Sequence, residues 1–221
     1  MSGPSRRSTM VLAGLAALAC GEIAAPIRSD LYEWRLVTPS IPGPGVDTLS
    51  FHWDRGDLPV RIWVQDINDM PAHVQRAIQV WEAAFLYREF QATLVTDSTD
   101  ADVIVLGGVS LAGLRSVRLP ASAPECAGVT DLDIDVESSQ LRLPIRVSVE
   151  PQAPPDDTGL ETCLALTTIH EMGHAIGIFA HSPDPDDIMF TDPQVELPST
   201  RDRQTAEAAY HTPPSLEVVR P

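Results

Sequence analysis

His170, Glu171 and His174 form the pattern HExxH, in which residues suited to metal binding and proton transfer stand at helical spacing. Histidines four positions apart lie one above the other on an α-helix, so both imidazoles can bind one metal ion. Zinc accepts neutral imidazole nitrogen and, in catalytic sites, keeps one of its four positions open for water. Glu171 lies on a different side of the helix, from which a general base can reach that water. The pattern predicts a catalytic zinc site.

A third ligand is expected from the chain that follows the predicted helix. Gly177 permits the left-handed conformation with which a chain turns back at a helix C-terminus, and His181 comes four residues later. The alternative is a buried helix that carries two histidines by chance, with His181 as a solvated loop residue. The arrival of Gly177, His181 and Met189 in this order favours the zinc site.

Residues 160–193 resemble the metzincin clan of zinc metallopeptidases, because HExxHxxG is followed by a histidine–serine pair and then by a methionine. The runs His-Ser-Pro-Asp at 181–184 and Asp-Ile-Met-Phe at 187–190 resemble the matrixin-like bacterial peptidases. Over residues 50–215 the order of elements fits such a catalytic domain more weakly. The resemblance implies three zinc ligands, a general base and a Met-turn residue: His170, His174 and His181, then Glu171, then Met189.

The chain departs from the family pattern at two positions. Three residues, not two, separate Gly177 from His181, so Ala180 stands where the ligand is usual. We expect a one-residue bulge that leaves His181 as the ligand, because the serine and the Met-turn keep their usual spacing from His181 rather than from Ala180. Asp184 is the alternative third ligand. Thr191 stands where some metzincins have a tyrosine, so the oxyanion would rest on zinc and protonated Glu171.

The first twenty residues resemble a bacterial lipoprotein leader. Arg6 and Arg7 precede an apolar stretch at 10–18 that is too short to span a bilayer, and Ala-Leu-Ala-Cys20 follows. We expect export, lipidation of Cys20 and membrane anchoring towards the periplasm or the cell exterior. Cleavage near Ala19 and secretion is the alternative.

Three cysteines are an odd number for an exported protein. With Cys20 lipidated, Cys126 and Cys163 can form a disulfide, which suits an oxidising compartment. Such a bridge would stabilise the fold by about 3–4 kcal/mol in the loop-entropy model. The alternative is two buried thiols.

The chain is strongly acidic, with a formal net charge of −16 and no lysine. This charge argues against nucleic acid and anionic membrane surfaces as partners. Asp131, Asp133, Asp135 and Glu137 alternate with apolar residues. Carboxylates are calcium ligands, so a structural Ca²⁺ site is possible, and the resemblance also favours one; the alternative is the solvent face of a strand.

The domain organisation is predicted from proline, glycine and hydrophobic patterning. After the leader at 1–20, a Pro/Gly-rich tether is expected at 21–47, although residues 31–34 could instead pack onto the domain. The catalytic domain is expected at 48–215 and a tail at 216–221. The expected elements are strands at 58–65, 102–106, 129–136 and 143–149, a helix from Pro71 in which His73 is a surface residue, and helices at 160–176 and 201–210.

These elements predict an α+β fold: a metzincin-like catalytic domain with a twisted mixed sheet, an N-terminal helix, a zinc-site helix, a Met-turn and a C-terminal helix. The expected function is that of a monomeric zinc endopeptidase, in which Glu171 activates a zinc-bound water against a peptide or protein substrate. The alternatives are an exported zinc-binding pseudoenzyme and a surface interaction lipoprotein without catalysis.

Overall fold

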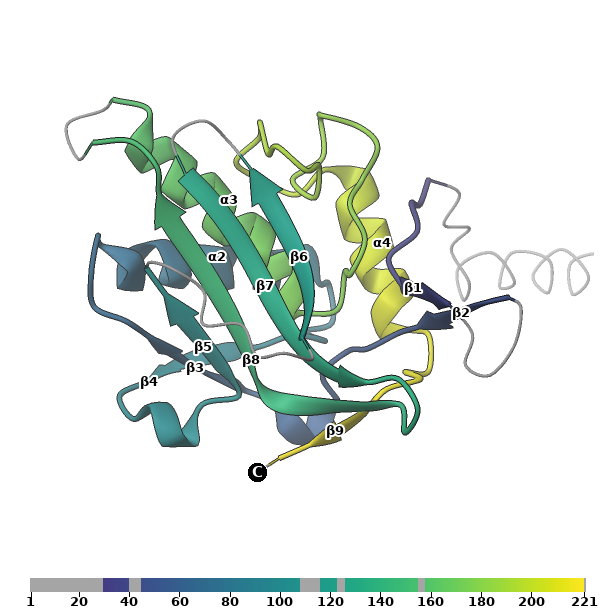
Figure 1. Ribbon diagram of the computed structural model, residues 1–221. Coiled ribbons are helices and arrows are strands. Elements are labelled where there is room, and N and C mark those ends of the chain that lie inside the picture. The colour runs from purple at the N-terminus through teal and green to yellow at the C-terminus, as the bar shows by residue number, and fades with distance from the viewer. Residues whose placement is uncertain (1–29, 40–44, 108–115, 123–125, 155–157, 221) are drawn as a thin grey trace, which may run out of the picture.

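The computed structural model describes residues 30–39, 45–107, 116–122, 126–154 and 158–220 (Figure 1). The expected leader and Cys20 lie outside these residues. No helix in the described ranges combines the length and the apolar character that crossing a membrane requires.

A mixed sheet of seven strands forms the centre of the described part of the chain, in the order β4-β3-β5-β8-β7-β6, with β9 pairing to β8. The pairs β3–β4, β3–β5, β5–β8 and β8–β9 are parallel, whereas β7 runs antiparallel to both β8 and β6. The strands span Val60–Val64 (β3), Ala92–Val95 (β4), Val103–Leu106 (β5), Ser116–Ser122 (β6), Cys126–Asp135 (β7), Gln140–Pro151 (β8) and Glu217–Val219 (β9). Short 3-10 helices lie at Arg55–Asp57 (η1) and Ser98–Asp100 (η2).

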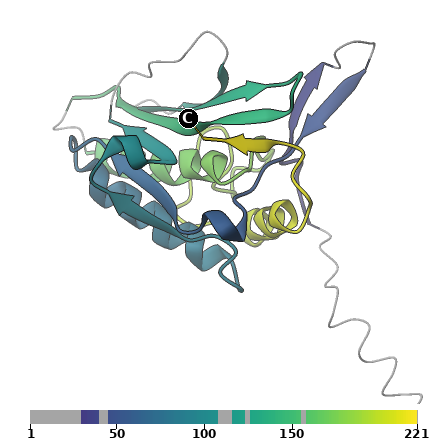
Figure 2. The same cartoon turned by 90° about the horizontal axis from the view of Figure 1, so that it is seen from below.

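Three α-helices of the described residues lie on one side of this sheet (Figure 2). They span Met70–Ala84 (α2), Leu160–Ala175 (α3) and Thr200–Tyr210 (α4). The predicted helix from Pro71 is confirmed, and its apolar residues Val74, Ala77, Ile78 and Trp81 are all buried. The indole of Trp81 donates a hydrogen bond of 2.8 Å to the carbonyl of Ile169, which joins α2 to the site helix. The coarse prediction of an α+β fold with a mixed sheet is therefore correct.

His73 is not the surface residue that was expected, because only 5% of it is exposed. It lies on α2 next to Val74, and its Nε2 is 3.6 Å from a carboxylate oxygen of Glu161 on α3. The helical pattern alone had placed it at the solvent boundary, whereas the packing of α3 against α2 covers it.

Described residues of the expected tether and tail pair as strands or pack on the domain. Leu36–Pro39 (β1) and Val46–Leu49 (β2) form an antiparallel hairpin, and Tyr32 is buried on the domain, so the alternative in which residues 31–34 pack onto it holds. At the other end Leu216 is 4% exposed, and β9 adds to the central sheet beside Gln140–Arg142. Composition alone does not distinguish a linker rich in proline and glycine from strands that flank such residues.

Candidate metal centre

Helix α3 ends in a turn that Gly177 makes possible. The N–H of Gly177 donates to the carbonyl of His174, and the N–H of Ile178 donates to that of Gly173, which is the Schellman arrangement of a helix C-terminus. Gly177 has a φ of 116°, and a Cβ at this position would collide with the carbonyl oxygen of Phe51. Only glycine fits both conditions, so the chain turns back here as expected.

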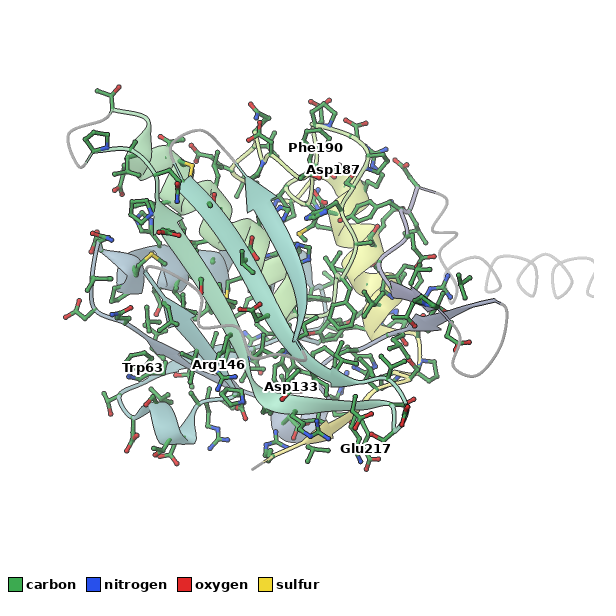
Figure 3. All side chains as sticks on the ribbon, in the orientation of Figure 1. Trp63, Asp133, Arg146, Asp187, Phe190 and Glu217 are labelled. Carbon is green, nitrogen blue, oxygen red and sulfur yellow. A yellow bond between two sulfur atoms is a disulfide. The ribbon has the colours of Figure 1, made fainter. Side chains whose placement is uncertain are left out.

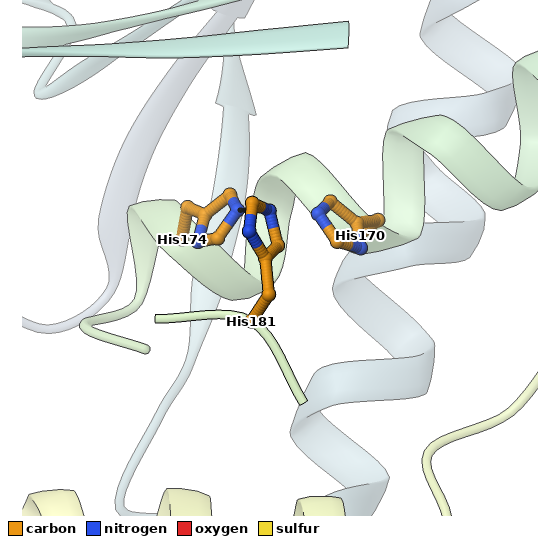
Figure 4. Close-up of side chains that lie close together, drawn as sticks. All are labelled: His170, His174 and His181. Atoms are coloured by element: carbon orange, nitrogen blue, oxygen red, sulfur yellow. Dashed lines mark hydrogen bonds between the residues drawn. The ribbon is translucent and has the colours of Figure 1, made fainter. Parts of the chain in front are cut away.

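The returning chain brings His181 to the two histidines of α3 (Figure 4). The Nε2 atoms of His174 and His181 are 3.2 Å apart, and one ligand nitrogen from each of the three rings lies within 4.8 Å of the others. The extra residue between Gly177 and His181 is thus accommodated in the loop, with Ala180 outside the cluster. Asp184, the alternative third ligand, forms an ion pair with Arg201 instead.

The two histidines of α3 use their Nδ1 atoms for hydrogen bonds to the backbone, so their Nε2 atoms are the ones that can bind a metal ion. Nδ1 of His170 donates to the carbonyl of Ile188 at 2.8 Å, and Nδ1 of His174 donates to that of Ile178 at 2.6 Å. The buried Nε2 of His170 has no hydrogen-bond partner among the described residues. Backbone acceptors behind metal-binding histidines fix the tautomer and the ring orientation. The donor set therefore fits a tetrahedral zinc ion with three nitrogen ligands.

All three histidines are held in the neutral form that binds metal. Burial lowers the pKa of His170 to about 3. Burial, together with the neighbouring rings of His170 and His181, holds the pKa of His174 well below its usual value. Burial also lowers the pKa of His181.

Glu171 is buried against strand β7, and two residues of that strand shape its surroundings. Its Oε2 accepts a hydrogen bond of 2.6 Å from the hydroxyl of Thr130. A Cβ on Gly128 would collide with the Glu171 carboxylate and with the methyl group of Thr167, so only glycine allows this close approach. Gly128 and Thr130 were not among the site residues predicted from the sequence. A glycine directly before the strand predicted at 129–136 is the one local feature that could have indicated a close contact there.

Met189 packs against α3 at Gly173, the residue before His174. It is fully buried, and a Cβ on Gly173 of α3 would collide with its sulfur. Its carbonyl accepts a hydrogen bond of 2.8 Å from the N–H of Ser182, the residue after His181. Asp187 and Phe190, which flank this segment, lie in the loop between α3 and α4 (Figure 3). Residues 188 and 189 thus contact both histidine segments: the Ile188 carbonyl bonds to His170, and the Met189 carbonyl bonds to the residue after His181.

The alternating acids of β7 do not gather into a carboxylate cluster. Asp133 and Asp135 both pair with Arg142, at 3.6 and 3.1 Å, and Asp131 is 4% exposed, so the row is not a plain solvent face either. In the described ranges the three histidines are the group close enough to hold a metal ion. Calcium stays a prediction.

Cys126 and Cys163 are joined by a disulfide, with Cα atoms 6.0 Å apart. The bridge connects the first residue of β7 to the first turn of α3, so it fastens the strand that carries Thr130 to the helix that carries Glu171. Thr167, between the bridge and Glu171 along α3, has its hydroxyl 3.2 Å from the Cys126 sulfur.

Comparison of the sequence with models of known protein families and with curated proteins found no match.

Proposed function

We propose that the protein is a zinc endopeptidase of the metzincin type, similar to the matrixin-like bacterial peptidases. The observation that carries the proposal is the convergence of three neutral histidines, with the Nδ1 atoms of both α3 histidines bonded to backbone carbonyls, beside the buried carboxylate of Glu171. The glycine turn at 177 and the buried Met189 support the same interpretation.

His170, His174 and His181 would hold zinc, which when bound supplies a Lewis acid that acidifies water and polarises a carbonyl group. Glu171 takes a proton from the attacking water at its carboxylate and later transfers it to the amine that leaves. The hydroxyl of Thr130, 2.6 Å from Oε2, keeps this carboxylate in place. Strand β6 forms the sheet edge beyond β7, and an extended substrate peptide would add to the sheet there.

The cellular setting belongs to the same proposal. The disulfide between Cys126 and Cys163 suits an oxidising compartment, which supports export. Lipidation of Cys20 would then anchor a monomeric catalytic domain at the membrane, with peptides or proteins as substrates.

Peptide cleavage by the wild type and by Glu171→Gln tests the proposal. The variant should keep one zinc per chain and lose activity by about 100- to 10,000-fold, the range that general acid–base catalysis contributes. Chelation should abolish wild-type activity, and added zinc should restore it. Equal cleavage by the two proteins would refute the mechanism. Zinc binding without cleavage of any peptide in a diverse library would favour the pseudoenzyme.

A further inference from the structure

The segment Leu31–Trp34 is seated on the metal-centre side of the domain. The Tyr32 hydroxyl donates a hydrogen bond of 2.7 Å to Oδ1 of Asp202, a residue 170 positions later on α4. Tyr32 is 7% exposed and Asp202 is fully buried. The backbone N–H of Tyr32 also donates to the hydroxyl of Thr205 on the same helix, at 3.4 Å. The contact is therefore a specific one between elements distant in sequence.

Asp202 extends this contact to the first histidine. Its Oδ2 accepts hydrogen bonds from the N–H of Ile188, at 2.9 Å, and from the N–H of Ser199, at 2.8 Å. The carbonyl of Ile188 in turn accepts the Nδ1–H of His170. Since Asp202 holds the N–H of the residue whose carbonyl orients His170, a continuous path runs from Tyr32 through Asp202 and Ile188 to the ring.

The same segment reaches the second histidine through one peptide group. The carbonyl of Trp34 accepts a hydrogen bond of 2.6 Å from the N–H of Phe179. The other side of that peptide group is the carbonyl of Ile178, which accepts Nδ1–H of His174 at 2.6 Å. A peptide group is planar and rigid, so fixing its N–H also aims its carbonyl.

We propose that Leu31–Trp34 is a positioning segment of the metal centre, which raises metal affinity by orienting His170 through Asp202 and His174 through the 178–179 peptide. The proposal rests on the metal site of the proposed function but not on peptidase activity. Outer partners of ligating histidines typically change metal affinity by about 10- to 100-fold. Tyr32 acts one bond further away, so its effect should be smaller.

The test is a zinc competition titration with a chromophoric chelator, on the full chain and on Tyr32→Phe. This substitution removes one hydroxyl and keeps the buried ring. Tyr210→Phe is the matched control, because Tyr210 is a partly buried tyrosine at the end of α4 whose ring packs against Phe85 and His52. We expect Tyr32→Phe to bind zinc about 3- to 10-fold more weakly than the wild type, below the range for direct outer partners. Tyr210→Phe should remain within about twofold of the wild type.

A second pair of variants separates positioning from folding. Asp202→Ala removes both acceptor oxygens and should weaken zinc binding by about 10- to 100-fold. Asp202→Asn keeps an oxygen for the two backbone N–H groups and an amide for the Tyr32 oxygen, so it should recover most of the affinity. The Tm of each metal-free variant, measured alongside, shows whether it is folded at the titration temperature.

The outcomes distinguish this proposal from the proposed function. If Tyr32→Phe lowers the Tm but leaves zinc affinity at the wild-type value, the segment is merely structural and the proposal is wrong. A wild type without zinc overturns both proposals. Weaker zinc binding in Tyr32→Phe, combined with a wild type that cleaves no peptide, supports the positioning segment and removes only the peptidase.

Discussion

At the scale of single residues, the site separates metal binding from proton transfer. The three histidines converge on one point, and their burial keeps them neutral. Glu171 follows His170 directly but turns towards β7, where Thr130 holds its carboxylate. A group placed in this way can move a proton without occupying a ligand position. Substitutions at Thr130 should therefore change turnover and leave metal binding unchanged.

Thr130→Val tests this separation. Valine has the shape of threonine without the hydroxyl, so the carboxylate of Glu171 loses its 2.6 Å donor. We expect kcat to fall by about 10- to 100-fold, in line with a hydrogen bond to a charged group worth about 1.5–3 kcal/mol, while zinc content stays at the wild-type value. Thr130→Ser, which keeps the hydroxyl, is the control and should retain most of the activity. A Thr130→Val enzyme with wild-type kcat would contradict the role given to Thr130.

At the scale of elements, the site is assembled by segments that are far apart in the chain. The HExxH spacing and the glycine turn are local, so the histidines of α3 and the return of His181 could be predicted from residue types and intervals. Thr130, Tyr32 and Asp202 could not, because their roles arise from β7, the N-terminal segment and α4 meeting around α3. Periodicity predicts which face of an element is buried but not which polar group it meets.

The hairpin of β1 and β2 and the last strand show the same limit. Pro and Gly between residues 37 and 45 indicated a linker, whereas the flanking residues pair as strands. The sequence of the last residues does not predict a strand, yet β9 pairs with β8. This is possible because β8 is long enough to pair with β5 along one part and with β9 along another. Register within a sheet depends on the partner strand, which lies elsewhere in the sequence.

The disulfide is a covalent link between β7 and α3, and its removal should lower the stability of the fold. Its two cysteines are 37 residues apart. The double variant Cys126→Ala/Cys163→Ala should lose about 3–4 kcal/mol of unfolding free energy by the loop-entropy relation. Denaturant unfolding of both proteins measures this loss. A reductant should lower the stability of the wild type alone; if it destabilises the double variant equally, the bridge is not the cause.

At the scale of the whole molecule, three histidines with lowered pKa values link the stability of the metal-free protein to pH. Their folded-state pKa values lie below the unfolded value of about 6.5, so the unfolded chain binds protons that the folded chain does not. Stability is therefore complete above pH 6.5 and falls as the pH decreases towards the folded pKa values. Each histidine can contribute at most about 1.4 kcal/mol per pH unit.

Thermal unfolding of the chelator-treated protein between pH 6.5 and 5 checks this dependence, in a range above the titration of most carboxylates. The Tm should fall steadily with decreasing pH. His170→Gln removes the group whose pKa burial lowers to about 3, so its Tm should depend less steeply on pH. An identical slope in the variant would mean that other groups control acid stability.

The central claim is that His170, His174 and His181 hold one zinc ion, and zinc content measured by elemental analysis tests it most directly. We expect one zinc per chain in the wild type and in His211→Ala, a control that removes a histidine outside the cluster. His181→Ala should contain far less zinc after the same dialysis. A wild type without stoichiometric zinc, or a His181→Ala variant that keeps it fully, would contradict the account.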